Sequence, residues 1–193
     1  STVTVTPIND APTLSATASN PTFTEGSGSG VQGSAVSVFS GASVSTVEAG
    51  QTIAGLTFTV SGVVDGTNEK IIVDGTTLTL SSGSTGTTQS NGLSYSVTFN
   101  GTNKVSTVVL SGGSLTASAA QTLVNGIQYQ NTSLDDPTSG SRVVTLTQLV
   151  DSGSNVAPNS NTATLSIAST VTVTPINDAP TLSATASNPT FTE

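Results

Sequence analysis

Apolar and polar residues alternate along most of this chain. In residues 56–60 and 93–99, Leu, Tyr, Val or Phe takes every second position, with Ser or Thr between. A period of two is typical of a strand that buries one face and exposes the other. The same pattern recurs at residues 2–6, 144–147, 165–167 and 171–173, the last two as one long final strand. Many short strands separated by turn residues predict an all-β fold, a β-sandwich.

A tight turn is predicted where Asp74-Gly75 separates two apolar runs. Residues 70–73 and 77–80 both have strand patterns, and Asp-Gly between two strands indicates a β-hairpin. Stretches rich in small polar residues are expected to be flexible surface connections. They lie at residues 26–30, 81–91 and 151–161.

One segment favours a helix. Residues 114–126 are rich in Ala at their centre and end at Gly126, a residue that often follows a helix. Thr116 or Ser118 can serve as N-cap, because either hydroxyl can accept a hydrogen bond from the first helical turn. We expect one or two helical turns there.

The chain contains a long exact repeat. Its first 25 residues, STVTVTPINDAPTLSATASNPTFTE, recur as residues 169–193, an offset of 168. An identity of this length indicates duplication, and a unit this long is expected to carry its own core. Two prolines interrupt the strand pattern in PINDAP, which indicates a linker. The predicted organisation is the end strand and linker of a preceding repeat at 1–12, one complete β-sandwich repeat at 13–174, a linker at 175–180, and the first strand of a following repeat at 181–193.

Composition narrows the classes of function. The chain has 3 Lys and Arg against 11 Asp and Glu, a net charge of −8, and no His, Cys, Met or Trp. This charge disfavours nucleic acid and anionic membrane surfaces, and no apolar run is long enough for membrane insertion. Without His or Cys, most nucleophile, general-base and zinc arrangements are unavailable, so we expect no enzyme.

The few carboxylates fall in turns and linkers rather than over a balanced surface. Asp135-Asp136 lies in one turn, and Asp151 lies in another that also carries Ser and Asn. Glu25 ends the first predicted strand, while Asp10 and Asp178 lie in the two linkers. Such hard oxygen donors suit Ca²⁺, which takes 6–8 of them.

The motif PINDAP after a Val/Thr strand resembles the interdomain linker of cadherin-like repeats in giant RTX-type, type I-secreted bacterial adhesins. Other stretches that look like this repeat class are residues 23–25, 64–69, 126–133 and 141–146. The resemblance implies an Ig-like or cadherin-like β-sandwich and calcium at the domain junctions. It implies a C-terminal junction made by Glu25, Asp135, Asp136, Asn177 and Asp178. Asn9 and Asp10 would belong to the N-terminal junction, and Asp151 would complete either one.

Two features depart from the cadherin pattern. The unit is longer, and the paired Asp-x-Asp of the cadherin calcium loop is absent, so we expect one or two ions rather than three. Asp65, Asn68 and Glu69 form either an internal calcium loop or a polar turn in which Glu69 faces Lys70 or solvent. Arg142 is a candidate partner for the Asp135-Asp136 turn, where it would compete with calcium.

The resemblance implies a structural extender on the bacterial cell surface, outside the cell, stiffened by calcium for cell adhesion or biofilm formation. Its partners would be neighbouring repeats of the same protein. A second hypothesis is a self-assembling fibre, in which the strand at 13–25 is supplied by another copy of the chain. A third is a ligand- or carbohydrate-binding module, which exposed aromatic residues would favour. We expect residues 181–193 to be poorly ordered or to pair with a neighbouring molecule.

Overall fold

A computed structural model describes residues 1–28, 30–180 and 182–193. Ser29 of the predicted 26–30 loop and Thr181 of the predicted following strand lie outside the described residues.

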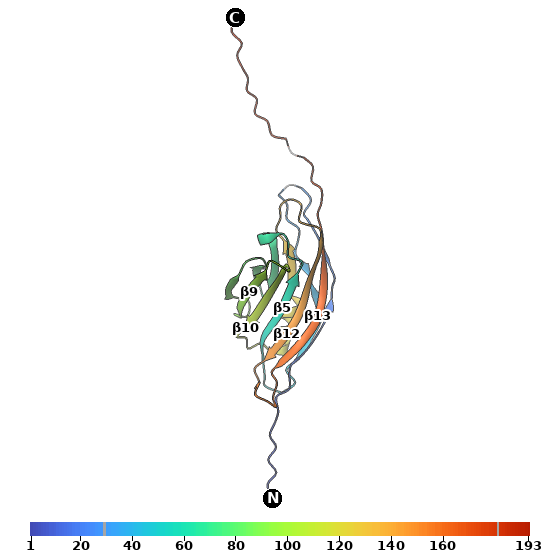
Figure 1. Cartoon of the computed structure of the whole chain (residues 1–193), viewed down its shortest axis with the longest axis vertical. Helices are drawn as coiled ribbons and strands as arrows, with labels where there is room; N and C mark the ends of the chain where they lie inside the picture. The colour runs from blue at the N-terminus through green and yellow to red at the C-terminus, as the bar shows by residue number, and fades with distance from the viewer. Residues whose placement is uncertain (29, 181) are drawn as a thin grey trace.

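The molecule is elongated, and its two terminal segments leave from opposite ends (Figure 1). The elements are β1 (Thr13–Ala18), β2 (Thr22–Thr24), β3 (Val36–Ser37), β4 (Phe39–Ser45), β5 (Ile53–Ser61), the 3₁₀ turn η1 (Gly66–Asn68), β6 (Glu69–Val73), β7 (Thr76–Thr79), β8 (Ser84–Thr87), β9 (Ser94–Asn100), β10 (Val105–Ser111), α1 (Ala117–Asn125), β11 (Gln128–Asn131), β12 (Gly140–Asp151) and β13 (Thr162–Thr174).

The prediction of an all-β sandwich is confirmed. One sheet has seven strands in the order β2-β13-β12-β5-β10-β9-β8, a second has four in the order β3-β11-β6-β7, and β1 pairs with β4. The strand pairs are antiparallel except β2 with β13, which is parallel. The sheets share one hydrophobic core, and the ring of Phe23 from β2 meets that of Tyr129 from β11 edge-on, with centroids 5.7 Å apart.

A bulge in β12 decides which of its polar residues are buried. Arg142, Val144 and Leu146 alternate toward the core, and the register of β12 then shifts between Leu146 and Gln148. An extra residue in one strand inverts the phase of the positions beyond it. Leu149 and Asp151 therefore face inward in the second half of the strand. One strand thus buries a cation near one end of the domain and an anion near the other.

The predicted helix is confirmed as α1, with Thr116 as its N-cap. The Thr116 hydroxyl accepts a hydrogen bond from Ala119 N at 3.1 Å. The helix turns Ala120, Leu123 and Val124 toward the core. No helix in the described part of the chain is long and apolar enough to cross a membrane.

The predicted hairpin is confirmed between β6 and β7, with Asp74 and Gly75 at φ angles of 49° and 75°. Left-handed angles at both central residues are the reason this turn uses Asp-Gly. Two of the three predicted flexible connections are more structured than expected. Residues 81–91 contain β8 and the buried Thr88, and residues 151–161 bind the N-terminal linker through hydrogen bonds.

The two copies of the repeated sequence have different structures. The strand predicted at 2–6 does not form in this chain, whereas the identical residues at 170–174 end β13, which confirms the long final strand. A strand needs a hydrogen-bonded neighbour, and residues 2–6 have none here. The single strand predicted over residues 13–25 is two strands, β1 and β2, in different sheets. The chain bends between them at Asn20, whose φ is 44°.

Candidate functional site

Asn9 of the first linker is buried at the N-terminal end of the domain, with 7% of its surface exposed. Its Nδ2 donates to Ser160 O at 2.7 Å and to Ser154 O at 3.2 Å, and it lies 3.5 Å from Asp151 Oδ1. Its backbone N–H donates to Asn159 Oδ1 at 2.7 Å, and its backbone oxygen accepts from Ser160 N at 2.9 Å. The linker is therefore fastened to the β12–β13 hairpin loop by both the side chain and the backbone of one residue.

We call the surroundings of Asn9 the linker socket. It is formed by Gln51, Asp151, Gly153, Ser154, Asn159 and Ser160. Gln51 Nε2 donates to Asn9 Oδ1. Gly153 leaves the space that the Asn9 amide occupies, because a Cβ at Gly153 would lie 2.0 Å from Asn9 Oδ1. Next to the socket, Asp10 N donates to Glu48 Oε1 at 3.0 Å.

Several oxygen atoms around this socket have no hydrogen-bond partner within the protein. They are Oδ2 of Asp151, Oε2 of Glu48 and Oε1 of Gln51, and all three are shielded from solvent. Asp151 itself is 1% exposed, because the bulge in β12 turns it inward. A buried carboxylate oxygen without a donor is costly. These atoms are therefore the places where a cation would be stabilised best at this end.

The second linker is fastened at the opposite end of the domain, by different atoms. Glu25 is 4% exposed and accepts from Ile176 N through Oε2 at 3.0 Å. Asp178 Oδ1 accepts from Gly28 N at 2.9 Å. The other carboxylate oxygen of Glu25, Oε1, is buried and has no partner within the protein. Each end of the domain thus binds a copy of the same linker and keeps a buried, unpaired carboxylate oxygen.

The structure brings the predicted junction residues together in two groups. Asn9, Asp10 and Asp151 gather at the N-terminal end, while Glu25 and Asp178 gather at the C-terminal end. Asp151 could not be assigned to either junction from the sequence, and it lies with Asn9. Within the described residues, no three acidic side chains gather closely enough to form a metal site by themselves.

The other members of the predicted C-terminal junction make few contacts. Asp135 and Asp136 are exposed, on a turn whose Leu134 O accepts from Gly30 N at 3.4 Å. This places the turn beside the loop that Asp178 contacts. Asn177 is exposed, and the contact of its side chain is with the neighbouring Asp178 O.

A buried ionic network occupies the segment expected to be an internal calcium loop or a polar turn. Arg142 Nη2 lies 2.8 Å from Glu69 Oε1 and 3.0 Å from Asp65 Oδ2, and Glu69 is 0% exposed. Tyr129 donates its hydroxyl to Glu69, and Asn131 donates to Asp65 at 2.6 Å. The carboxylates are therefore satisfied by protein donors rather than free for an ion.

This network corrects two expectations. Glu69 faces neither Lys70 nor solvent, and Arg142 pairs with Asp65 and Glu69 rather than with the Asp135-Asp136 turn. The reason is that Arg142 lies at an inward position of β12, where it reaches the start of β6. Asn68 stays on the rim of the network, where Thr132 donates to its side-chain oxygen at 3.4 Å.

The network also shifts the protonation of its members. Burial raises the pKa of the Tyr129 hydroxyl above its ordinary value, and the adjacent Glu69 charge raises it further. Burial acts to lower the pKa of Arg142, but hydrogen bonds and charge from Glu69 outweigh burial and raise it. Tyr129 therefore stays neutral and Arg142 stays charged over the physiological range.

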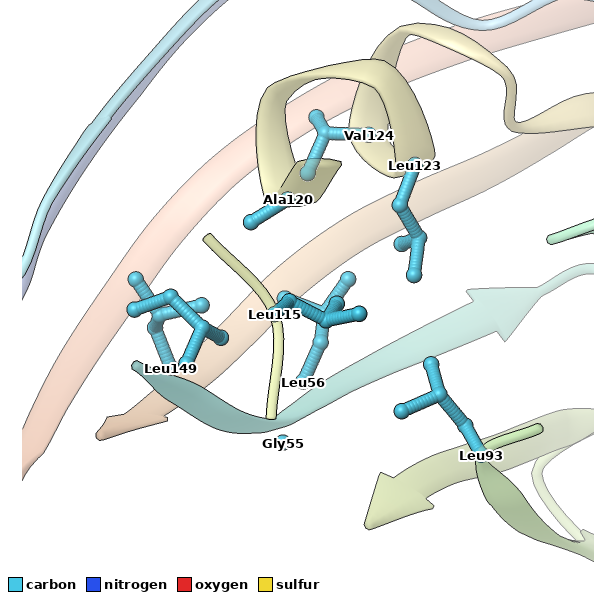
Figure 2. A pocket seen from close by; sticks show the side chains of 9 residues that line it. Gly55, Leu56, Leu93, Leu115, Ala120, Leu123, Val124 and Leu149 are labelled. Carbon is cyan, nitrogen blue, oxygen red and sulfur yellow. The ribbon is translucent and has the colours of Figure 1, made fainter. Parts of the chain in front are cut away.

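An apolar cavity lies under α1, lined by aliphatic side chains that include Leu56, Leu115, Leu123 and Leu149 (Figure 2). Its volume of about 10 Å³ is near the minimum that one water requires. Such a cavity is a small packing defect between helix and sheet and has no room for an organic ligand. Among the large hydrophobic side chains that the described residues expose, Phe191 is the one aromatic.

Sequence reasoning missed three residues that complete the site. Glu48, Gln51 and Asn159 contact Asn9 or Asp10, although the sequence around Glu48 indicates only a simple turn. One feature of the sequence could have indicated Glu48 and Gln51. They lie on either side of a Gly-containing turn, and no Lys or Arg is near them in the sequence to pair with Glu48. No family model, curated protein or solved structure matches this chain.

Proposed function

We propose that this chain is a structural extender repeat of a bacterial cell-surface adhesin, serving cell adhesion or biofilm formation outside the cell. The observation that carries the proposal is that the two copies of one linker sequence, before and after the domain, both form hydrogen bonds with the domain. The linker before the domain binds through Asn9 and Asp10 N, and the linker after it binds through Ile176 N and the Asp178 carboxylate.

These two sets of contacts are compatible in one linker. Asn9 and Asn177 are the same residue of the repeat, as are Asp10 and Asp178. The Asp uses its backbone N–H toward the following domain and its carboxylate toward the preceding one, and no atom is required twice. In an array, a single PINDAP linker can therefore hold two consecutive domains at once. Attachment on both sides restricts hinge motion at the linker. An extender requires this restriction to stay straight.

The shape of the unit supports the same proposal. The linkers leave at opposite ends of the long axis, and strands β5, β12 and β13 run between these ends (Figure 1). A pull on the two linkers would load strand pairs that lie beside one another over most of the domain. The chain offers no reaction site in this proposal, and we assign it no catalytic role.

We propose further that Ca²⁺ occupies the junctions. The donor set fits a hard cation, because each end has a buried carboxylate oxygen without a partner within the protein, and the N-terminal end also has the amide oxygen of Gln51. Asp151, Glu48 and Gln51 would hold it on the following domain, and Glu25 on the preceding one. Asp135 and Asp136 are candidates at the outer face of the C-terminal end. When bound, the ion would neutralise carboxylates that few cationic side chains balance.

Calcium of this kind would act by linkage. An ion that binds the folded junction but not the unfolded chain raises stability by RT ln(1 + [L]/Kd), about 2.7 kcal/mol at a hundredfold excess over Kd. The expected result is a higher melting temperature in calcium than in chelator at equal ionic strength. Asp151→Asn should reduce this shift. An unchanged melting temperature would remove calcium from the proposal and leave the hydrogen-bonded linker to be tested separately.

A further inference from the structure

Residues 14–25 form an arm that is held only at the edges of two sheets. Its first part, in β1, pairs with β4, and its second part, in β2, pairs with the end of β13. No strand covers the other side of either segment in the described structure. The arm nevertheless supplies core side chains, since Leu14 is 9% exposed and Phe23 is 1% exposed. It is therefore a removable strand pair whose site is shaped by the rest of the domain.

The same arm occurs a second time in the chain, and there it has no partner strand among the described residues. Residues 182–193 repeat residues 14–25 letter for letter. There, Leu182 is 92% exposed and Phe191 is 90% exposed. Two large apolar side chains that are buried in one copy thus face solvent in the other. Any site that accepts the first copy has the shape and hydrogen bonds to accept the second.

The second copy cannot reach the site in its own molecule. Leu14 lies five residues after Asn9, which is buried at the N-terminal end of the domain, so the place that Leu182 would have to reach is near that end. Asp178 is held at the C-terminal end by Gly28 N, and the four steps from Asp178 to Leu182 span at most about 14 Å. A segment this short keeps Leu182 near the C-terminal end, and the two linkers leave from opposite ends of the long axis (Figure 1).

We propose that residues 182–193 of one molecule replace the arm 14–25 of a second copy of this chain. Leu182 and Phe191 would take the places of Leu14 and Phe23, and the preceding Asn177 would take the place of Asn9 in the linker socket. The displaced arm is released with its own linker. The product is a head-to-tail assembly in which each non-covalent contact reproduces the covalent linkage of the repeat. This association needs no calcium and does not depend on the extender function.

A pair of substitutions at equivalent positions tests the exchange. Phe23→Ala weakens the resident arm and leaves the incoming one intact, whereas Phe191→Ala weakens only the incoming one. Truncating a buried Phe costs enough to shift the competition by on the order of a hundredfold. Light scattering coupled to size exclusion, in chelator, should show more oligomer for Phe23→Ala than for the unchanged chain. It should show less for Phe191→Ala, and Phe23→Ala/Phe191→Ala, which weakens both arms equally, should fall back to the level of the unchanged chain. Equal masses for Phe23→Ala and the double variant would overturn the proposal.

A covalent trap decides the question even if Phe23→Ala does not fold. The chain has no cysteine, and the exposed Thr22 and Thr172 are paired across β2 and β13. Thr190 is the copy of Thr22, so chains carrying Thr172→Cys mixed with chains carrying Thr190→Cys should form disulfide-linked heterodimers. Each variant alone measures random collision, and Thr22→Cys/Thr172→Cys shows that the site can be bridged within one molecule. Strand exchange would be refuted if heterodimers were no more frequent than random homodimers while the Thr22→Cys/Thr172→Cys control formed its disulfide efficiently. That result would leave the calcium melt and the linker contacts unaffected.

Discussion

Asn9 and Asn177 occupy the same position of an identical 25-residue sequence, yet Asn9 is buried in the linker socket and Asn177 is exposed. The two residues differ in the segment on their C-terminal side. A folded domain begins four residues after Asn9, at Thr13, and it supplies Asp151, Asn159 and Ser160. In this chain no folded strand comes after Asn177 among the described residues. The linker Asn is therefore a contact toward the domain that comes after it.

The first prediction uses these two residues as a matched pair. Asn9→Ala removes several hydrogen bonds and leaves the groups around it without partners, which should lower the free energy of unfolding by about 1–3 kcal/mol. Asn177→Ala removes one long hydrogen bond on the surface and should change the free energy of unfolding by less than about 0.5 kcal/mol. Urea unfolding of both variants measures the difference. Equal effects would show that the socket contributes nothing.

The second prediction concerns the space beside Asn9. Gly153→Ala places a methyl group 2.0 Å from Asn9 Oδ1 and should expel the linker, with a loss similar to that of Asn9→Ala. Because the clash is with the Asn9 side chain, Asn9→Ala/Gly153→Ala should cost less than the sum of the two single changes. Gly101→Ala is the control, since its Cβ would meet only Phe99 at 3.6 Å. Additive costs in the double variant would contradict the contact.

The third prediction concerns the buried ion pair. Arg142→Met leaves the charge of Glu69 buried without its partner and should cost about 3–5 kcal/mol. Adding Glu69→Gln removes that charge and keeps an acceptor for Tyr129, so the double variant should be more stable than Arg142→Met alone. Lys104→Met removes an exposed cation and should be nearly neutral. Thermal and urea unfolding measure the series, and a double variant weaker than Arg142→Met would contradict the account.

The fourth prediction concerns alkaline pH. Burial and the Glu69 charge raise the pKa of Tyr129 in the folded state, so the folded protein keeps this proton where the unfolded chain loses it. The stabilisation is complete below the unfolded pKa of about 10 and is lost as pH rises above it, by up to about 1.4 kcal/mol per pH unit.

Urea unfolding between about pH 9 and 11.5 measures that slope. Tyr129→Phe should be less stable at neutral pH, because Glu69 loses a hydrogen-bond donor. It should also lack the part of the fall in stability at alkaline pH that comes from the Tyr129 hydroxyl. Tyr95→Phe, at a partly buried site, should keep it. A slope that persists unchanged in Tyr129→Phe would contradict the assignment.

Local patterns in the sequence predicted the elements well. Alternation, Asp74-Gly75 and the Ala-rich segment before Gly126 correspond to strands, a hairpin and a helix respectively, because these signals act over a few residues. The bulge between Leu146 and Gln148 carries no comparable signal, although it determines that Asp151 is buried. Periodicity alone therefore could not show which face Asp151 takes.

Contacts between distant segments were the part that the sequence could not supply. The partner of Arg142 was expected in the nearby acidic turn, but the inward face of β12 brings Arg142 to Asp65 and Glu69, more than 70 positions earlier. Asn9 likewise meets residues about 150 positions away. The repeat itself was visible at once, whereas the use of different atoms by its two copies required the fold.

The most direct test of a linker fastened on both sides is small-angle scattering from a two-unit protein, made by appending residues 26–193 again after Glu193. Asn177 then lies in the middle linker and has a socket of its own. We predict a rod whose longest dimension approaches the sum of two units, measured in calcium. Asn177→Ala, neutral in the single unit, should shorten and broaden the distance distribution, as should chelator. A flexible pair of domains with the same distribution for the unchanged protein and for Asn177→Ala would contradict the account.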